Sequence, residues 1–167
     1  MEKIWVAGDN GVTGSWGIVG NTIEPHFFTV PTKKELSFQK TKAKNISRID
    51  VPALVDILTP WVKKYQVMAI LERPLLNPGR WVASISAIRA LEATLIVFEQ
   101  LGIPYGYCDS KVWQKELLPG GLKGSADLKK ASMDVGVRTF PMWEKEIRKH
   151  KDADGLLIAE YARRKNL

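Results

Sequence analysis

The chain has 167 residues and a mass of 18.8 kDa, which fits one domain with a core large enough to need no metal or disulfide. With 45% hydrophobic and 26% charged residues, the composition excludes a disordered or fibrous protein. Its single cysteine, Cys108, excludes an internal disulfide and favours a reducing, cytoplasmic compartment. We find no apolar run of about 20 residues and no apolar signal-peptide core, so no membrane association is expected.

The net charge of +7 is unevenly distributed along the chain. The excess of Lys and Arg gathers in KKELSFQKTKAKN (33–45), KGSADLKK (123–130) and ARRKNL (162–167). Such clusters attract polyanions, although basic patches also occur on proteins that bind none. A nucleic-acid partner and a solvated basic face therefore both remain open from charge alone, whereas nothing points to a small-molecule substrate.

The first thirty residues predict three strands that form an antiparallel meander. They cover residues 3–9, 15–19 and 22–30. The first strand is apolar on both alternating faces up to Asp9, which is typical of a strand buried in the middle of a sheet. Pro25 removes a hydrogen-bond donor from the third strand and places it at the sheet edge.

The next segment, 32–47, is polar and without periodicity, and we interpret it as a long, mobile loop. A helix is predicted over 50–65, with Pro60 expected to kink it. Residues 67–74 (VMAILERP) then predict another fully buried strand, ended by Glu72. The helix between these strands makes the second one parallel to the first.

The strongest helix prediction covers 79–102, which is rich in alanine and ended by Gly102. Its small residues would permit close approach of a second subunit; they are Ala83, Ser84, Ala87 and Ala90. The remaining predicted elements are a strand at 103–108 and helices at 110–117, 125–136 (with Ser125 as a candidate N-cap) and 152–165. The whole predicts an α/β fold with a five-stranded mixed sheet flanked by helices.

Three acidic residues stand out against this pattern. Asp9 and Glu72 each end a fully buried strand, and parallel neighbours would bring both carboxylates to the same edge of the sheet. Asp154 shares a helix face with apolar residues, at positions 157, 158 and 161. Because crowded like charges raise one another's pKa, such a group persists when a cation neutralises it. Oxygen ligands suit Mg²⁺, with Mn²⁺ as a substitute, and two such ions could hydrolyse a phosphodiester.

Each acid also has a structural alternative. Asp9 precedes a turn, and Glu72 could simply end its strand in water. Asp152 and Asp154 occupy positions where helix N-caps and first-turn acids are favoured. A cap is the stronger interpretation of Asp152 taken alone, whereas the apolar neighbours of Asp154 favour a buried ligand.

The segments VAGDNG (6–11), AILERP (69–74) and HKDADGLLIA (150–159) resemble the acidic motifs of RuvC-type Holliday-junction resolvases, in the ribonuclease H-like superfamily. The phage-type members are the most similar in character, and a phage-encoded protein would work in the host cytoplasm. The resemblance implies a single nuclease domain over 1–167 that acts as a homodimer in DNA recombination and repair. It implies symmetric cutting of a four-way junction that leaves 5′-phosphate and 3′-hydroxyl ends.

The resemblance also implies roles for individual residues. Asp9, Glu72 and Asp154 would be metal ligands. The family's fourth ligand lies three residues before the last Asp, where this chain has Lys151, so Asp152 or His150 would substitute, with Asp152 preferred.

Further residues are expected to contact the nucleic acid. Lys129 matches a family lysine near the scissile phosphate, with Lys130 as the adjacent candidate. Leu75, followed by Leu76, matches a residue that wedges into the junction, although packing at a core edge is the stronger alternative. Other phosphate contacts are expected from Arg73, Arg80, Lys111, Lys115 and Lys123.

Three other functions are compatible with part of this sequence pattern. One is a nuclease of the same fold that cuts RNA, RNA–DNA hybrid or branched DNA less selectively. GDNGVTG (8–14) also resembles the phosphate loop of actin-like ATPases, but those carry two comparable domains and this chain has room for one. A binding module without catalysis is disfavoured by the three intact acids.

Overall fold

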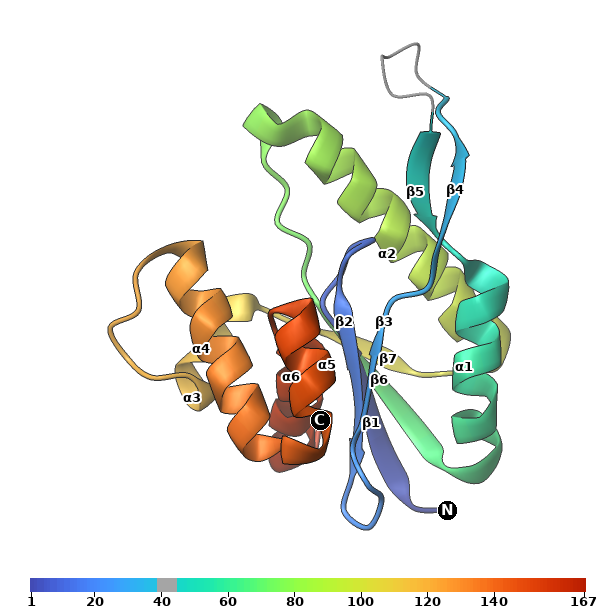
Figure 1. Ribbon diagram of the computed structural model, residues 1–167. Helices are drawn as coiled ribbons and strands as arrows, with labels where there is room; N and C mark the ends of the chain where they lie inside the picture. The colour runs from blue at the N-terminus through green and yellow to red at the C-terminus, as the bar shows by residue number, and fades with distance from the viewer. Residues whose placement is uncertain (39–44) are drawn as a thin grey trace.

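The computed structural model describes residues 1–38 and 45–167 (Figure 1). Its centre is a five-stranded sheet in the order β3-β2-β1-β6-β7. The strands are β1 (Lys3–Gly8), β2 (Ser15–Gly20), β3 (His26–Thr29), β6 (Gln66–Glu72) and β7 (Tyr105–Cys108). β1 pairs antiparallel with β2 and parallel with β6, so the predicted mixed sheet is confirmed. The edge strand β3 begins directly after Pro25, as the missing donor requires.

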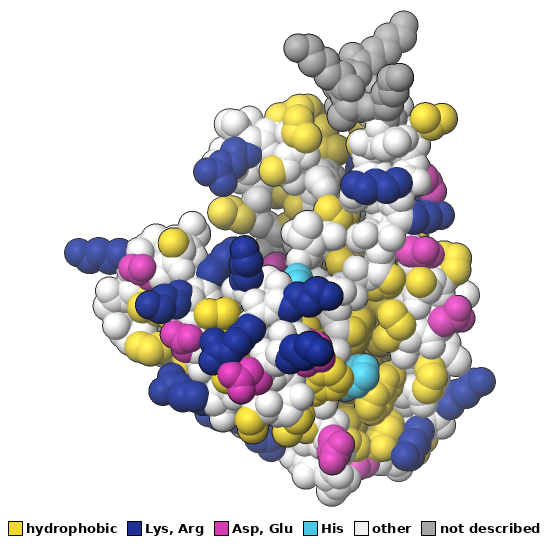
Figure 2. Space-filling model, viewed as in Figure 1, with side chains coloured by type: hydrophobic (Ala, Val, Ile, Leu, Met, Phe, Trp, Pro, Cys, Tyr) yellow, Lys and Arg dark blue, Asp and Glu magenta, His cyan; other side chains and the backbone are white. Residues whose placement is uncertain are grey.

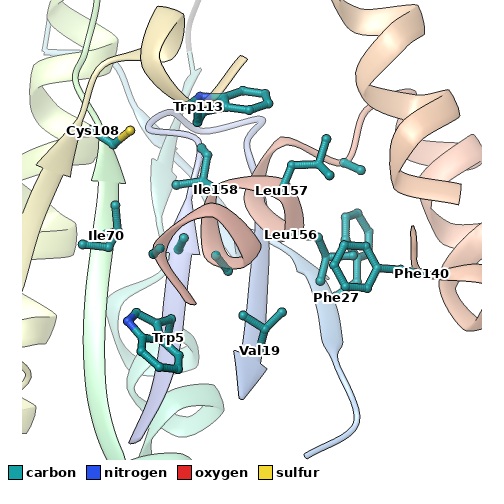
Figure 3. Packing of buried hydrophobic residues seen from close by; sticks show 14 of the residues in the cluster. Trp5, Val19, Phe27, Ile70, Cys108, Trp113, Phe140, Leu156, Leu157 and Ile158 are labelled. Atoms are coloured by element: carbon teal, nitrogen blue, oxygen red, sulfur yellow. The ribbon is translucent and has the colours of Figure 1, made fainter. Parts of the chain in front are cut away.

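Helices cover both faces of this sheet and create two hydrophobic cores. One core lies under α1 (Val51–Lys64) and α2 (Trp81–Leu101). The other lies under α6 (Asp154–Lys165), with the shorter helices outside it (Figures 1 and 3). Those outer helices are α3 (Ser110–Leu117), α4 (Gly124–Thr139) and α5 (Glu144–His150). Successive residues of β1 enter the two cores alternately, which explains why its sequence is apolar on both faces.

Helix α6 approaches β2 so closely that two glycines are required. A Cβ on Gly17 would lie 2.4 Å from the Cα of Leu156, and a Cβ on Gly155 would lie 2.4 Å from the carbonyl oxygen of Ser15. Backbone atoms block both positions, so neither contact can be relieved by a side-chain rotation. The first turn of α6 is thereby fixed against the sheet.

The prediction of a loop over 32–47 is wrong for the residues that the structure describes. β4 (Thr32–Leu36) and β5 (Asn45–Ile49) pair as a separate antiparallel hairpin, while 39–44 lie outside the described residues. Polar side chains occupy both faces of this hairpin, so the sequence lacks the polar–apolar alternation that would predict its two strands. Cross-strand contacts hold it instead, including Lys34 Nζ to Ser47 Oγ at 2.9 Å.

Three helix predictions also need correction. Ser125 is not the N-cap of α4, because Lys123 is extended and the helix already begins at Gly124. Helix α5 and the 3-10 turns at Pro78–Arg80 and Pro141–Trp143 were not predicted. The last helix begins at Asp154, two residues later than expected. α1 begins where Asp50 accepts a hydrogen bond from Ala53 N, and it continues through Pro60.

The segment Pro78–Leu101 is, among the described residues, the one helix long and apolar enough to cross a membrane by length and composition. Its mean hydropathy is 1.6, and 28% of the apolar window is buried. Arg89 and Glu92 interrupt its sequence, so the helix meets this criterion by average hydropathy and not by an unbroken apolar run. The small residues of α2 differ in solvent exposure: Ser84 and Ala90 are buried, whereas Ala83 is exposed.

Candidate active site

Asp9 and Glu72 lie side by side at the carboxyl end of the central strands. The parallel register of β1 and β6 ends with Gly8 opposite Leu71, so Asp9 and Glu72 are the next residues of neighbouring strands, which lie about 4.8 Å apart. The alternation of side chains decides which way both carboxylates point. Ala7 and Ile70, two residues earlier, pack in the core beneath α6, so Asp9 and Glu72 face the same helix.

The start of α6 brings two more carboxylates to this place, and a buried serine contacts each one. Ser15 Oγ donates to Asp152 Oδ1 at 2.9 Å and accepts from Gly155 N at 3.0 Å. Ser132 Oγ donates in the same way to Asp154 Oδ1. Both serines are at most 1% exposed, so these hydrogen bonds fix the orientation of the two aspartates.

Trp113 is a site residue that the sequence did not reveal. It lies in α3, is fully buried, and donates from Nε1 to Glu72 Oε2 at 2.8 Å. The partners are 41 positions apart, and Trp113 looks like an ordinary apolar residue of a short helix. Its indole orients the Glu72 carboxylate from behind, as outer partners of metal ligands commonly do.

The carboxylates raise one another's pKa. Burial, followed by the charge of Glu72, raises the pKa of Asp9 to about 8. Burial and then Asp152 raise the pKa of Asp154 to about 7. Burial also raises the pKa of Glu72, against the effect of the hydrogen bond from Trp113. These groups are therefore within electrostatic reach of one another, in a place where nearby positive charge does not offset burial and repulsion.

Lys129 is the basic residue that acts on these carboxylates. Its charge lowers the pKa of both Asp9 and Asp154, although burial outweighs it. The predicted alternative, Lys130, instead lines a separate hollow with Asp127 and Asp134. Of the two adjacent lysines, Lys129 is the one near the carboxylates.

The carboxylates approach one another without forming a closed ligand shell. Within 1–38 and 45–167, no three Asp, Glu, His or Cys side chains are grouped closely enough to hold a metal ion. The donor chemistry nevertheless fits a hard dication, because every candidate ligand atom is a carboxylate oxygen and three of the groups have raised pKa values. Mg²⁺ typically keeps several waters and takes substrate phosphates as further ligands, so it needs no complete protein cage.

The turn before α6 determines which of residues 150–152 faces the other carboxylates. Lys151 has a left-handed backbone (φ 73°) and is exposed. The following residue, Asp152, then points inward and is 4% exposed. His150 lies behind it, with Nε2 at 3.5 Å from Asp152 Oδ2. Asp152 also accepts from Asp154 N at 3.3 Å, but Ala153 is the N-cap of α6 and makes no side-chain cap hydrogen bond, so the interpretation of Asp152 as a cap is wrong.

A hollow of about 300 Å³ connects the carboxylates to the loop after β6. Asp9 and Glu72 line it together with Arg73, Leu75 and Arg80. Leu75 is 89% exposed, so the interpretation that it packs at a core edge is wrong. Arg73 is held by an ion pair with Asp109, from Nε to Oδ1 at 2.9 Å.

The other predicted phosphate contacts are exposed on neighbouring helices. Lys111 and Lys115 lie on α3 and Lys123 directly precedes α4; among the described contacts, none joins these lysines to the carboxylates. Figure 2 shows many Lys and Arg side chains over the helices on this side of the sheet.

Comparison with known proteins supports the fold. No protein-family model matches the sequence, and no curated protein sequence matches it either. The structure is similar to that of Thermus thermophilus RuvC in complex with a Holliday junction substrate, with a TM-score of 0.56 and 16% sequence identity. That similarity covers 96% of this chain and 95% of that one. A second structure of Thermus thermophilus RuvC gives a TM-score of 0.48 at 15% identity, over 98% and 96% of the two chains. The chain therefore has the ribonuclease H-like fold of RuvC, as its acidic motifs predicted.

The raised pKa values predict an unusual dependence of stability on pH. A carboxyl group whose pKa is higher in the folded state stabilises the protein at low pH, and this stabilisation is lost as the pH rises through the folded pKa. In chelator, the free energy of unfolding should therefore fall between pH 5 and pH 8.5. Asp9→Asn should be more stable than the wild type at pH 8.5 by more than about 1 kcal/mol.

Urea denaturation at several pH values measures this effect. Asp56→Asn, on the exposed side of α1, is the matched control and should follow the wild type. Mg²⁺ should restore stability to the wild type at pH 8.5 but much less to Asp9→Asn. A wild-type curve that is flat over this range in chelator would contradict the crowding of charge.

The indole hydrogen bond to Glu72 predicts a role for Trp113 in cation binding. Trp113→Phe keeps a ring in the core but removes the donor, so it should weaken Mn²⁺ binding about 10- to 100-fold, the usual cost of losing an outer-shell partner. Isothermal titration calorimetry with Mn²⁺ measures the change. Trp61→Phe, on the opposite face of the sheet, should leave the affinity unchanged; equal affinities for all three proteins would rule out the orienting role.

Proposed function

We propose that the protein is a structure-selective DNA endonuclease that resolves four-way junctions. The observation that carries this proposal is the convergence of four carboxylates from β1, β6 and the start of α6 at one end of the sheet. The fold adds support, because the RuvC structure that it resembles was captured with a Holliday junction substrate. Phosphodiester hydrolysis is the chemistry that such an acidic group supplies when it holds Mg²⁺ or Mn²⁺.

In this proposal Asp9, Glu72, Asp152 and Asp154 would hold two divalent ions, and the chemistry that these would supply when bound is activation of a water and stabilisation of the leaving oxygen. The cut leaves a 5′-phosphate and a 3′-hydroxyl. The protein's own contribution is orientation: Ser15, Ser132 and Trp113 fix the carboxylates through buried hydrogen bonds. Lys129 adds positive charge where the scissile phosphate would lie.

The hollow beside the carboxylates would receive the DNA. Arg73 and Arg80 line it and can neutralise phosphates. Leu75 projects from the same wall almost fully exposed, as an inserted wedge must. Lys111, Lys115, Lys123 and Lys130 would extend this contact along α3 and α4.

The exposed side of α2 supports a homodimer. A stripe of apolar residues runs along it, formed by Ile85, Ile88 and Ile96, of which the last two are 48% and 47% exposed. Arg89 and Glu92 lie within the stripe. Burying these two charges in lipid would be costly, so we assign this face to a protein partner and not to a membrane. If two copies of α2 crossed antiparallel between these residues, each Arg89 would pair with the partner's Glu92. The same contact would then form twice, as two-fold symmetry requires.

The decisive experiment compares cleavage of matched substrates with Mg²⁺ or Mn²⁺. A four-way junction should be cut at symmetric positions and at least about 10-fold faster than linear duplex, flap or RNA–DNA hybrid. Denaturing gels with end-labelled strands measure both the rate and the position. Equal cutting of hybrid or duplex would replace the proposal with a less selective nuclease of the same fold.

Asp9→Asn provides the active-site control for this comparison. It should abolish cutting but keep or tighten junction binding, because it removes a negative charge beside the phosphates. Electrophoretic mobility shifts in Ca²⁺ measure the binding. Parallel loss of binding and cutting would mean that Asp9 has a structural role only.

The dimer is tested by a charge placed on the stripe. The wild type should have a mass in solution of about twice 18.8 kDa, and Ile88→Glu should shift it to the monomer, since the charge would be buried unpaired at the interface. Light scattering after size-exclusion chromatography gives the mass. Met142→Glu, an equally exposed apolar position away from α2, should remain dimeric; a monomeric wild type at micromolar concentration would refute the dimer.

A further inference from the structure

Another hollow, of about 450 Å³, lies between the edge strand β3 and helix α5. It is lined by Phe27, Phe28, Thr29, Glu146, Lys149 and His150. Its volume is in the range of sites that hold small organic groups. None of the roles assigned above uses this place.

The aromatic wall of this hollow is fixed in position before any ligand binds. The ring centroid of Phe27 lies 6.0 Å from that of His150 and 6.3 Å from that of Trp143. The Trp143 indole in turn donates to a backbone carbonyl at 2.7 Å. Phe28, the next residue of β3, points to the opposite face of the sheet and stacks there on the buried Trp16 with centroids 5.8 Å apart, so its ring is not part of this wall. A flat ligand would therefore meet a wall that needs little ordering.

Only one layer of side chains separates the hollow from the carboxylates. His150 lines the hollow, and its Nε2 lies 3.5 Å from Asp152 Oδ2. Ser15, which donates to Asp152, is the register partner of Thr29 across β2 and β3. A strand held at the carboxylates would therefore pass beside the hollow within a short distance.

Positive charge lies at the mouth of the hollow. Lys149 is exposed and has no ion pair within the described parts of the chain, and Lys151 follows it on the exposed turn. Glu146 adds one carboxylate to the lining, which disfavours a site for a free anion alone. An exposed ammonium beside a hollow with an aromatic lining suits single-stranded nucleic acid, with the lysine on a phosphate and the base in the hollow.

We infer that this hollow is a nucleotide subsite that takes one unstacked base of the strand being cut, while Lys149 contacts an adjacent phosphate. The inference rests on the proposed function, since the strand must pass over the carboxylates. The subsite lies on the β3 side of the site, opposite the loop of Leu75 that follows β6. It would let the protein select the base near the cut independently of the shape of the junction.

The test uses four-way junctions that each lack a single base at one position flanking the cut. Binding is measured in the Asp9→Asn background, which prevents cutting, with the hollow either intact or filled by Thr29→Trp. With the hollow intact, one abasic position should weaken binding roughly 5- to 100-fold, the range for loss of one stacked base. With Thr29→Trp, the same position should change binding by less than about twofold, because the base no longer has a site.

Lys149→Ala tests the phosphate contact, with Lys145→Ala on the same helix as the matched control. Lys149→Ala should weaken binding of every junction alike and lower the salt dependence by about one phosphate contact, whereas Lys145→Ala should not. Equal effects of the two lysine variants would overturn the assigned role of Lys149.

The remaining outcomes separate the subsite from the proposed function. Abasic positions that affect the intact and filled proteins equally overturn the subsite and leave junction cleavage standing. A wild type that neither binds nor cuts junctions refutes both. If Thr29→Trp does not fold, photocrosslinking from single 5-iodouracil bases decides: a crosslink to 26–29 or 146–150 supports the subsite, and crosslinks confined elsewhere overturn it.

Discussion

The candidate site depends on the contact between the first turn of α6 and strand β2. Gly17 and Gly155 let the two backbones approach to a distance that no side chain would permit. This contact carries Asp152 and Asp154 from the far end of the chain to the end of β1. A methyl group at either glycine would push the helix outward, and the aspartates would move with it. The chemistry therefore depends on two residues that have no chemistry of their own.

That arrangement places carboxylates where burial and mutual repulsion oppose their ionisation, as the raised pKa values of Asp9 and Asp154 show. The surrounding fold tolerates this because two large cores lie on the faces of the same sheet. Functional sites are the places where a protein accepts locally unfavourable interactions that the rest of the structure offsets. Ser15, Ser132 and Trp113 satisfy the carboxylates by hydrogen bonds without neutralising them, which leaves their charge available to a cation.

The sequence predicted the sheet and the convergence of Asp9 and Glu72 because both follow from local signals: an apolar run on both strand faces and the acid that ends it. It did not predict the β4–β5 hairpin, whose charged residues occupy both faces and show no period. Trp113 could not be recognised either, since only tertiary structure reveals that its partner is Glu72. The exposure of Leu75 was misjudged for a related reason, because composition does not tell which apolar residues the fold leaves uncovered.

The position of Trp113 has one practical consequence. An indole bonded to a carboxylate has an ultraviolet emission that responds to the charge beside it, so the protein carries an optical reporter within its own core. Among the described residues, none of the other five indoles donates to a side-chain carboxylate, so Trp113→Phe identifies the part of the signal that reports on Glu72. Occupancy of the carboxylates can thus be followed in unlabelled protein, in real time and without any substrate.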